Sequence, residues 1–489
     1  MAEVTANGRS AGIVDLYRTV WDSGRTYAER NRLAIIVEVG FIAAYVLLRS
    51  AGLGRDSLMA WLVATLLVAV VSPGSGLVIL AAIAPFSEPL VFTRQLGAKP
   101  VIIVALALGV TLRLVPEVVQ DLRARNLRRP TWPLVFAGFV AVGTALGVAH
   151  SYLRFGPAFG IDAAQSWIAG IGGALVVLGV AFWSAAHGNL RPIVAAVVAG
   201  AIGGIVSLGD WFHATALRDS AFAWLLRPTR FETRLSGIIS SPNGVASLVV
   251  MPTAVLAAAA VLARDVRLRL VAALLVISLA ATLYFTYSRA ALLGMFVIAV
   301  VLAWRVRRAL GGALLAAGIV AGIVLLPAYL ATRSAAVGGG GEVDPSGVIV
   351  ASDLQRLNAW AAAGRMALER PITGHGFLAY SQLHEAYGDR VLRAPHNEWL
   401  RLFAEEGVIV GLAGIAFAVS TFVVLVRWPG WLGAGTASAF AGWAITATFN
   451  NPTGFIQVGV LLGAIAGTGL ALAARPTTEG STGDESTGP

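Results

Sequence analysis

The sequence predicts an all-α fold: a polytopic bundle of about 12 to 14 transmembrane helices with a long helical loop on its outer side. Two observations carry this prediction. The 489 residues are 57% hydrophobic and only 13% charged, with a mean hydropathy of +0.77, which a soluble domain of this size does not sustain. Apolar runs of about 15 to 25 residues recur from Leu33 almost to Arg475, each long enough to cross the bilayer as a helix.

Two polar segments flank the apolar part of the chain. Residues 1–32 are too polar for a cleaved secretory signal, so we expect a retained membrane helix to follow them. We assign 1–32 to a cytoplasmic leader, either an interfacial helix or a solvated segment. Residues 33–475 form the membrane domain, and the polar, low-complexity stretch 476–489 is expected to be a disordered cytoplasmic tail.

Fourteen apolar runs are candidate membrane spans. They cover approximately residues 33–49, 58–72, 76–92, 100–115, 132–150, 164–185, 192–208, 240–262, 269–286, 290–304, 309–328, 407–426, 431–448 and 454–474. The second and third runs are separated by a stretch with Pro73 and Gly74, so one re-entrant hairpin is an alternative for this pair. Twelve spans are the alternative total.

The positions of the arginines predict how the chain is oriented across the membrane. The formal net charge is +10, and Lys99 is the single lysine. Arginine clusters fall at residues 123–129, 264–269 and 305–308, and single arginines at 191, 427 and 475. With fourteen spans and a cytoplasmic N-terminus, all of these lie inside, as the positive-inside rule requires. The outer segments are then about 209–236, 288–289 and 331–397.

Arginines in these outer segments depart from the positive-inside bias. A charge at the membrane edge is costly, so an arginine kept there needs a partner. An anionic ligand is one candidate, and an ion pair with a neighbour such as Asp219 or Glu232 is the other.

The long outer segment 331–397 contains the residues best suited to catalysis or to substrate binding. Ser352-x-x-Gln355 has the spacing of a capping box and predicts a helix that continues up to Pro371. Arg356 lies in its first turns, and Trp360, four positions on, lies over the same face. Such a tryptophan can stack on a sugar ring, although anchoring a helix at the interface is its commoner role.

A second helix is predicted to begin after the Arg-Ala-Pro-His-Asn run at 393–397, with Asn397 as its N-cap. His396 then lies at the helix N-terminus. The helix dipole and nearby arginines lower the pKa of the imidazole and favour the neutral ring, which can act as a general base. A structural histidine is the commoner alternative on these local features.

Metal chemistry has little support in the sequence. Cysteine is absent, which excludes disulfides and thiolate metal sites. His213, His375 and His384 also lie outside, but their spacings match no compact ligand motif, and Glu342-x-Asp344 beside a glycine run is a weak one. We therefore expect no metal site and no cofactor.

Four sequence pieces occur in order within residues 190–430. They are RLSGIISSPNG at 234–244, YSRAALLG at 287–294, RPITGHGF at 370–377 behind Arg356 and Trp360, and HNEWLRLFAEEGVIVG at 396–411. In this order, with a long outer loop before the fourth, they resemble the O-antigen ligase/polymerase superfamily. Members of that superfamily transfer glycans from polyprenyl diphosphate carriers. A dozen spans are usual in the family, so the resemblance leaves the early spans undecided.

The resemblance implies roles for single residues. Arg289 and Arg356 match the diphosphate-binding arginines, His396 matches the catalytic histidine, and Arg234 is a weaker match. We add four neighbours as candidate substrate-binding residues: Ser288, Trp360, Asn397 and Glu398.

For three residues the ordinary structural role is the commoner alternative. Ser288 can bond a phosphate oxygen or cap a helix. Glu398 can assist the histidine or be a solvated helix-start carboxylate. Asn243 is expected to satisfy backbone groups where a helix is broken near the outer surface.

Together these features imply an inverting, metal-independent glycosyltransferase that uses an undecaprenyl diphosphate-linked glycan. The acceptor is a second lipid-linked repeat, a lipid A core or a protein hydroxyl, and a ligase or polymerase is favoured. The expected location is the bacterial cytoplasmic membrane, with the active site facing the periplasm. Membrane lipid is an expected partner, and nucleic acid is not.

A membrane transporter or lipid-linked glycan flippase is the alternative from another class of protein. Its signature is charge deep in several spans together with inverted repeats. In this sequence Glu38, in the first span, is the main charged residue expected deep in the membrane, and no convincing internal repeat is found.

Overall fold

The computed structural model describes residues 31–88, 90–93, 96–123, 131–212, 219–226, 234–239, 241–321 and 345–474. Within these ranges the regular structure is helical, apart from one isolated bridge between Val91 and Gly97. The predicted all-α fold is confirmed. The interpretations of the leader, of the tail from residue 476 and of the glycine run at 338–341 fall outside the described residues.

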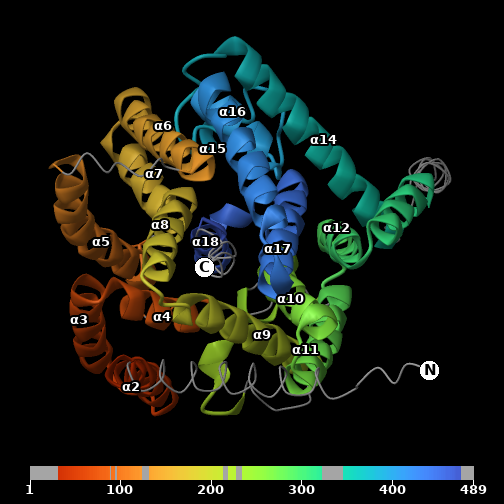
Figure 1. Ribbon diagram of the computed structural model, residues 1–489. Helices are drawn as coiled ribbons and strands as arrows, with labels where there is room; N and C mark the ends of the chain where they lie inside the picture. The colour runs from red at the N-terminus through yellow and green to blue at the C-terminus, as the bar shows by residue number, and fades with distance from the viewer. Residues whose placement is uncertain are drawn as a thin grey trace, which may run out of the picture.

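The helices follow one another along the chain (Figure 1). They are α2 (Arg32–Ser50), α3 (Arg55–Val71), α4 (Pro73–Ile83), α5 (Ala98–Arg123), α6 (Trp132–Phe155), α7 (Pro157–Ala169), α8 (Ile171–Ala186), α9 (Arg191–Trp211), α10 (Pro242–Leu262), α11 (Val266–Phe285), α12 (Arg289–Val306), α14 (Pro345–Glu369), α15 (Tyr380–Leu383), α16 (Glu398–Arg427), α17 (Gly430–Phe449) and α18 (Ile456–Ala473). Short 3-10 turns are η2 (Ala223–Leu225), η3 (Gly237–Ile239) and η4 (Pro452–Gly454).

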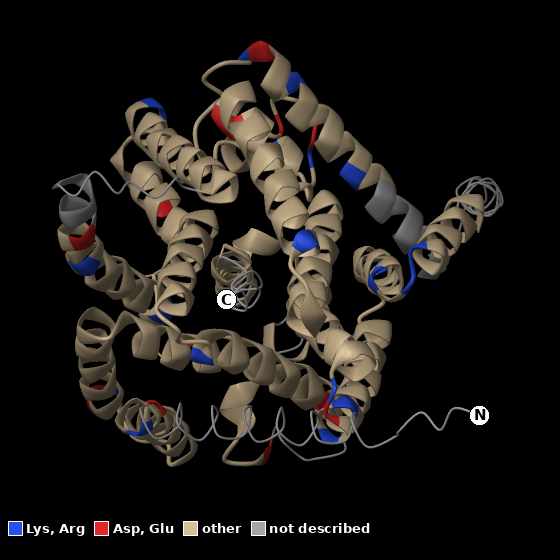
Figure 2. Ribbon diagram, in the orientation of Figure 1, with Lys and Arg blue, Asp and Glu red and all other residues tan. Residues whose placement is uncertain are grey.

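Ten helical stretches within the described ranges are long and apolar enough to span a membrane. They are α2, residues 98–117 of α5, α6, α7 with α8, α9, α10, α11, α12, α16 and α18. The protein is therefore an integral membrane protein of the polytopic helical class. Figure 2 shows that most of the length of these helices carries no charged residue.

Four of the fourteen predicted spans are not among these ten. The run 58–72 yields α3, a helix of 17 residues. The run 76–92 yields only the short α4, which ends at Ile83 just before Pro85. In the run 309–328 a helix is described over Arg308–Ala321, and the rest of the run lies outside the described residues. The run 431–448 yields α17, whose many glycines, alanines, serines and threonines place it outside the ten.

Helix α18 lies near the middle of the bundle in Figure 1. Of the residues in its most apolar stretch 83% are buried, against 11% in α2, so α18 is central and α2 is peripheral among the described helices. Small residues allow this close packing. A Cβ atom added to Gly463 would lie 2.6 Å from the carbonyl oxygen of Ala174 in α8, and one added to Gly467 would lie 2.2 Å from that of Leu178. These two glycines let the backbones of α8 and α18 approach.

Helix α14 lies beside α16 at the outer edge of the bundle (Figure 1). Its buried face consists of Ala359, Ala362, Ala363 and Met366, which pack with Tyr380 and Ala404. The helix begins at Pro345, so Ser352 lies inside it and the predicted capping box there is wrong. The predicted end is close to the observed one, because Pro371 follows soon after Glu369.

Helix α16 bends at Gly407, where φ is +82°. A side chain there is excluded by space as well as by φ, because a Cβ atom would lie 2.2 Å from the carbonyl oxygen of Ile372. The segment after α14 holds the bend: the Val408 N–H donates to the Pro371 carbonyl at 2.6 Å, and the Gly376 N–H donates to the Glu405 carbonyl at 2.7 Å. The predicted span beginning near residue 407 coincides with this bend.

Candidate functional site

Four segments that are distant in sequence meet beside the N-terminal end of α16. The segment before α10 contributes Arg234, the start of α12 contributes Arg289, and α14 contributes Arg356. The fourth segment, immediately before α16, contributes His396. The charges of the three arginines act on one another, and that of Arg356 acts on His396. The structure therefore brings together all four of these predicted residues.

Arg234 is held in place by neutral groups. Its Nε donates to the Thr286 carbonyl at 2.9 Å, and a terminal nitrogen donates to Oδ1 of Asn243 at 3.3 Å. Ser241 caps α10 by accepting from the Gly244 N–H at 3.2 Å, and within the described residues the predicted contact of Asn243 with backbone groups is not observed. Asn243 is thus available to orient a guanidinium.

Arg289 is the first residue of α12, a position where a cation meets the positive end of the helix dipole. The turn before it is tight, with Tyr287 in the left-handed region at φ +49°. Ser288 occupies the N-cap position and is buried, but its side chain makes no capping hydrogen bond. The capping role foreseen for Ser288 is therefore not observed. An arginine at this end of a helix is favourable when an anion accompanies it.

Arg356 is half-buried in α14. Burial lowers the pKa of its guanidinium, and the charge of Arg289 lowers it further. The pKa of Arg234 is lowered by burial and then by the charges of Arg356 and Arg289. Arginine stays protonated at physiological pH, so these shifts report mutual repulsion in a partly desolvated place. A bound anion would relieve that repulsion.

His396 has a left-handed backbone, with φ +51°, which is uncommon for a residue other than glycine. Burial lowers the pKa of its imidazole and the charge of Arg356 lowers it further, whereas Asn450 and Asp389 act in the opposite direction. Nδ1 of the ring lies 3.4 Å from Oδ1 of Asn450. The lowered pKa agrees with the prediction, although burial contributes more than the arginine. A neutral imidazole at this place can accept a proton.

Trp360 lies on α14 one turn after Arg356, as predicted, and its ring packs at 6.1 Å from that of Phe449 at the end of α17. Its indole N–H is buried and has no hydrogen-bond partner among the described residues. This contact joins α14 to the end of α17, and the role of Trp360 as an interfacial anchor stays a prediction.

Asn397 and Glu398 have structural partners. Oδ1 of Asn397 accepts from the Leu400 N–H at 3.0 Å, which confirms the predicted N-cap of α16. Glu398 is 1% exposed, pairs with Arg401 and accepts from the Thr453 hydroxyl. The expectation of a solvated carboxylate is therefore wrong: α18 and the turn before it cover this face of α16.

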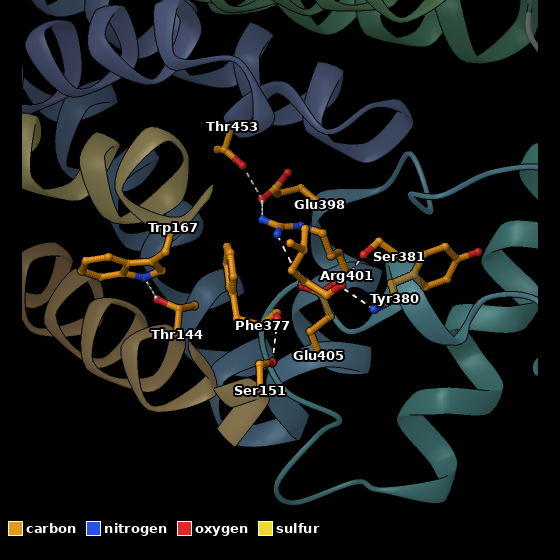
Figure 3. Close-up of polar contacts among 11 residues, drawn as sticks. Thr144, Ser151, Trp167, Phe377, Tyr380, Ser381, Glu398, Arg401, Glu405 and Thr453 are labelled. Carbon is orange, nitrogen blue, oxygen red and sulfur yellow. Dashed lines mark hydrogen bonds and ion pairs between the residues drawn. The ribbon is translucent and has the colours of Figure 1, made fainter. Parts of the chain in front are cut away.

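A buried ion network underlies the start of α16 (Figure 3). Arg401 lies between Glu398 and Glu405, with a distance of 3.4 Å to the latter, and its guanidinium lies 5.4 Å from the ring centroid of Phe377. Glu405 also accepts from the backbone N–H of Tyr380 at 3.2 Å. Sequence reasoning missed this network, although the spacing Glu-x-x-Arg-x-x-x-Glu is that of neighbours on one helix face.

Replacing Arg401 with alanine is expected to lower the free energy of unfolding by about 3 to 5 kcal/mol, because it leaves two buried carboxylates without their counter-ion. Thermal melting in detergent measures the effect. Arg427→Ala is the matched control, since Arg427 is an exposed arginine at the other end of the same helix. Equal melting temperatures for the two variants would contradict a structural role for the network.

The remaining polar candidates have structural roles or lie outside the described residues. His375 is buried, with Nδ1 2.9 Å from Arg154 and Nε2 3.1 Å from the Met366 carbonyl. Nδ1 of His384 lies 2.7 Å from the Asp389 carbonyl. His213 and the Glu342-x-Asp344 motif fall outside the described ranges.

Charge within the spans is more extensive than the sequence reading found. Glu38 in α2 pairs with Arg191 at the start of α9, at 3.4 Å. Glu405 and Glu406 are buried in α16, next to its bend. The Glu38 pair and the Arg401 network are carboxylates with basic partners in place, which is how membrane proteins hold buried charge.

One comparison with known proteins gives a match. A family model described as O-antigen ligase matches residues 273–416, a range that contains Arg289, Arg356 and His396. Arg234 and Asn450 fall outside it. No curated protein matches the chain.

Proposed function

We propose that the protein is a membrane glycosyltransferase of the O-antigen ligase family acting on a polyprenyl diphosphate-linked glycan, a proposal that the family match over residues 273–416 supports. The observation that supports the proposal most strongly is the convergence of Arg234, Arg289 and Arg356 beside His396. The cluster offers positive charge for a diphosphate, and the histidine offers a base next to it.

The arginines would bind the diphosphate of the donor. Guanidinium groups match phosphate oxygens in a bidentate geometry and keep their charge at any physiological pH. As the bond from the anomeric carbon to the diphosphate oxygen breaks, its electron pair moves onto the diphosphate. Three fixed guanidiniums stabilise that developing charge. Because these residues supply the positive charge, the proposed transfer needs no metal ion.

His396 would take the proton from the acceptor hydroxyl. The hydroxyl oxygen attacks the anomeric carbon on the face opposite the leaving diphosphate, so the configuration inverts. The proton passes to the neutral imidazole as the new glycosidic bond forms. The lowered pKa of His396 supports this role, since it keeps the ring neutral before the transfer.

We further propose that the donor carrier is undecaprenyl diphosphate and that the site faces the periplasm from the bacterial inner membrane. The division into leader 1–32, membrane domain 33–475 and tail 476–489, with an outer segment 331–397, belongs to the same proposal. A lipid A core, a second lipid-linked repeat and a protein hydroxyl are the candidate acceptors. The donor chemistry is shared by all three.

The test is transfer of labelled glycan by the purified protein in detergent, from a polyprenyl diphosphate donor and with EDTA present. We expect product in the presence of the chelator, with the anomeric configuration inverted when the linkage is determined by NMR. Failure to bind the donor or to form a product with any of the three acceptors would sink the proposal. Movement of intact donor across proteoliposomes without transfer would favour a flippase instead.

The transfer rate should remain high as the pH falls to the ordinary pKa of histidine, about 6.5. The reason is that the pKa of His396 is lowered, so the neutral, active form persists to a lower pH. In Arg356→Gln the positive charge that lowers the pKa of His396 is absent, so that pKa should rise. The fall in transfer rate on the acid side of the pH profile, the acid limb, should then move to higher pH. Transfer rates measured at saturating donor from roughly pH 5 to 9, the range around this pKa, locate the acid limb of the wild type and of the variant. An acid limb above that of free imidazole in the wild type would contradict the assignment.

A further inference from the structure

The connection between α17 and α18 lies against the candidate base. Helix α17 ends at Phe449, and Asn450 continues it with an extended backbone, φ −155° and ψ 175°. Pro452 then begins the turn η4. Asn450 is only 4% exposed, and its Oδ1 is the group 3.4 Å from Nδ1 of His396. A buried amide at a break between two membrane helices thus contacts the imidazole.

We propose that Asn450 is a positioning residue that fixes the tautomer of His396, and that its amide N–H and the indole N–H of Trp360 bind hydroxyl oxygens of the acceptor glycan. The inference rests on the proposed function and adds to it a specific acceptor subsite. The contact between Asn450 and His396 could not be predicted from the local sequence, because the two residues are 54 positions apart.

The tautomer follows from the inventory of donors and acceptors. An amide oxygen only accepts, so the nitrogen that faces it, Nδ1, carries the proton. In the neutral ring Nε2 then has the free lone pair and is the atom that accepts the proton of the acceptor hydroxyl. Without the amide, both tautomers are populated, and one of them has its proton on the nitrogen that must act as the base.

Apart from the contact with Asn450, His396 is positioned by the backbone conformation of the residue and of its neighbours. The left-handed backbone is unfavourable for a residue with a side chain and persists because its surroundings hold it. Asn397 caps α16 on one side. On the other side Asp389 fixes the incoming loop, accepting from the Val391 and Leu392 N–H groups and from the Tyr380 hydroxyl. These contacts place the Cα atom, and Asn450 selects the orientation of the ring.

Two buried donors near the end of α17 support a ligand site. Nδ2 of Asn450 and Nε1 of Trp360 have no hydrogen-bond partner within the described part of the chain. The Trp360 ring packs on that of Phe449, the residue directly before Asn450, so both donors lie at the same end of α17. A buried donor without a partner is unfavourable, so a ligand atom that accepts from it is favoured.

The chemistry of these donors points to carbohydrate hydroxyls. They are neutral, whereas the groups that face the donor diphosphate are guanidiniums. A sugar hydroxyl accepts from N–H groups and donates its own proton to a base, which the free Nε2 of His396 provides. An anion would be drawn to the arginines instead. The two sets of donors therefore divide the site into a diphosphate side and an acceptor side.

The experiment compares four single variants with the wild-type protein in the transfer assay, over a range of pH and of acceptor concentration. Asn450→Asp keeps the shape and the accepting oxygen but adds a negative charge. Asn450→Leu removes the amide, and Trp360→Phe removes the indole N–H. Asn451→Ala is the matched control, because it removes the adjacent amide, which has no contact with His396 among the described residues. Thermal melting follows folding in each variant.

We expect Asn450→Asp to transfer at alkaline pH and to move the acid limb up by about one pH unit or more, because the new carboxylate favours the imidazolium. The charged groups already acting on His396 are Arg356 and Asp389, and both are unchanged in this variant. Asn450→Leu should lower kcat on the order of 10- to 100-fold, less than the loss of a charged orienting group. Trp360→Phe should raise KM for the acceptor by roughly three- to tenfold with little change in kcat, the loss of one hydrogen bond.

The inference is overturned if the acid limb of Asn450→Asp coincides with that of the wild type, or if Asn451→Ala is as impaired as Asn450→Leu. It is also overturned if Trp360→Phe leaves KM for the acceptor unchanged. Should Asn450→Leu fail to fold, the near-isosteric Asn450→Asp still decides the question. A wild-type protein that transfers no glycan refutes the proposed function itself, which distinguishes that failure from failure of the acceptor subsite.

Discussion

Replacing His396 with alanine is expected to reduce kcat for glycan transfer by about 10³-fold, within the range that a general base contributes. The variant loses the group that takes the proton from the acceptor hydroxyl and keeps the three arginines that bind the diphosphate. Donor affinity should therefore change little, so that kcat falls while binding of the donor persists. Initial rates and equilibrium binding of the labelled donor in detergent separate the two quantities.

Two further variants control for the loss of a ring at this position. His396→Gln keeps polarity and approximate size but offers no basic nitrogen, so it should be as inactive as the alanine variant. His187→Ala removes an exposed histidine at the end of α8 and should transfer normally. Transfer by His396→Ala within tenfold of the wild type would show that another group is the base.

Removing either Arg289 or Arg356 is expected to lower kcat/KM for the donor by about 10²- to 10³-fold, the usual effect of losing one preorganised group that stabilises a developing charge. For Arg356→Ala we also expect a melting temperature no lower than that of the wild type without donor. The reason is that Arg356 and Arg289 repel each other in a partly buried place. Loss of function without loss of stability is the signature of a ligand-binding cluster.

The matched control for Arg356 is another arginine of the same helix. Arg365 lies about two and a half turns further along α14, hence on the opposite face. It is exposed, and its Nε donates to the Tyr387 carbonyl at 3.0 Å. Arg365→Ala should bind the donor and transfer normally. If it were as inactive as Arg356→Ala, or if the donor bound Arg356→Ala and wild type equally, the cluster would not be the diphosphate site.

The fold class was predictable because the bilayer imposes a simple requirement on sequence. Each span must be long and apolar, and hydropathy reports both properties. Its backbone must be hydrogen-bonded within the span because lipid offers no partner, which makes it a helix. The number of spans was less predictable. Whether an apolar run such as 76–92 crosses the membrane depends on where its helix ends, and α4 ends at Ile83. Hydropathy alone does not contain that information.

Local signals also located part of the site. The N-cap of α16 at Asn397 and the place of His396 next to it follow from residues within one helical turn, so short-range rules apply. The relation between Arg356 and Trp360, one turn apart on α14, was predictable in the same way. These features need no knowledge of what surrounds the helix.

The partners of those residues were decided by tertiary structure. Glu398 was expected in water but is buried by Arg401 and Thr453, and Asn243 was expected to bond backbone but holds Arg234. The contact between His396 and Asn450 joins two distant helix ends. Burial and electrostatic coupling depend on which helices pack together, and no local pattern encodes that. The sequence by itself therefore determined that the chain is a helical membrane protein with a histidine at the start of a helix. Tertiary structure decided which residues share the site of that histidine, because α10, α12, α14 and α17 pack around the start of α16.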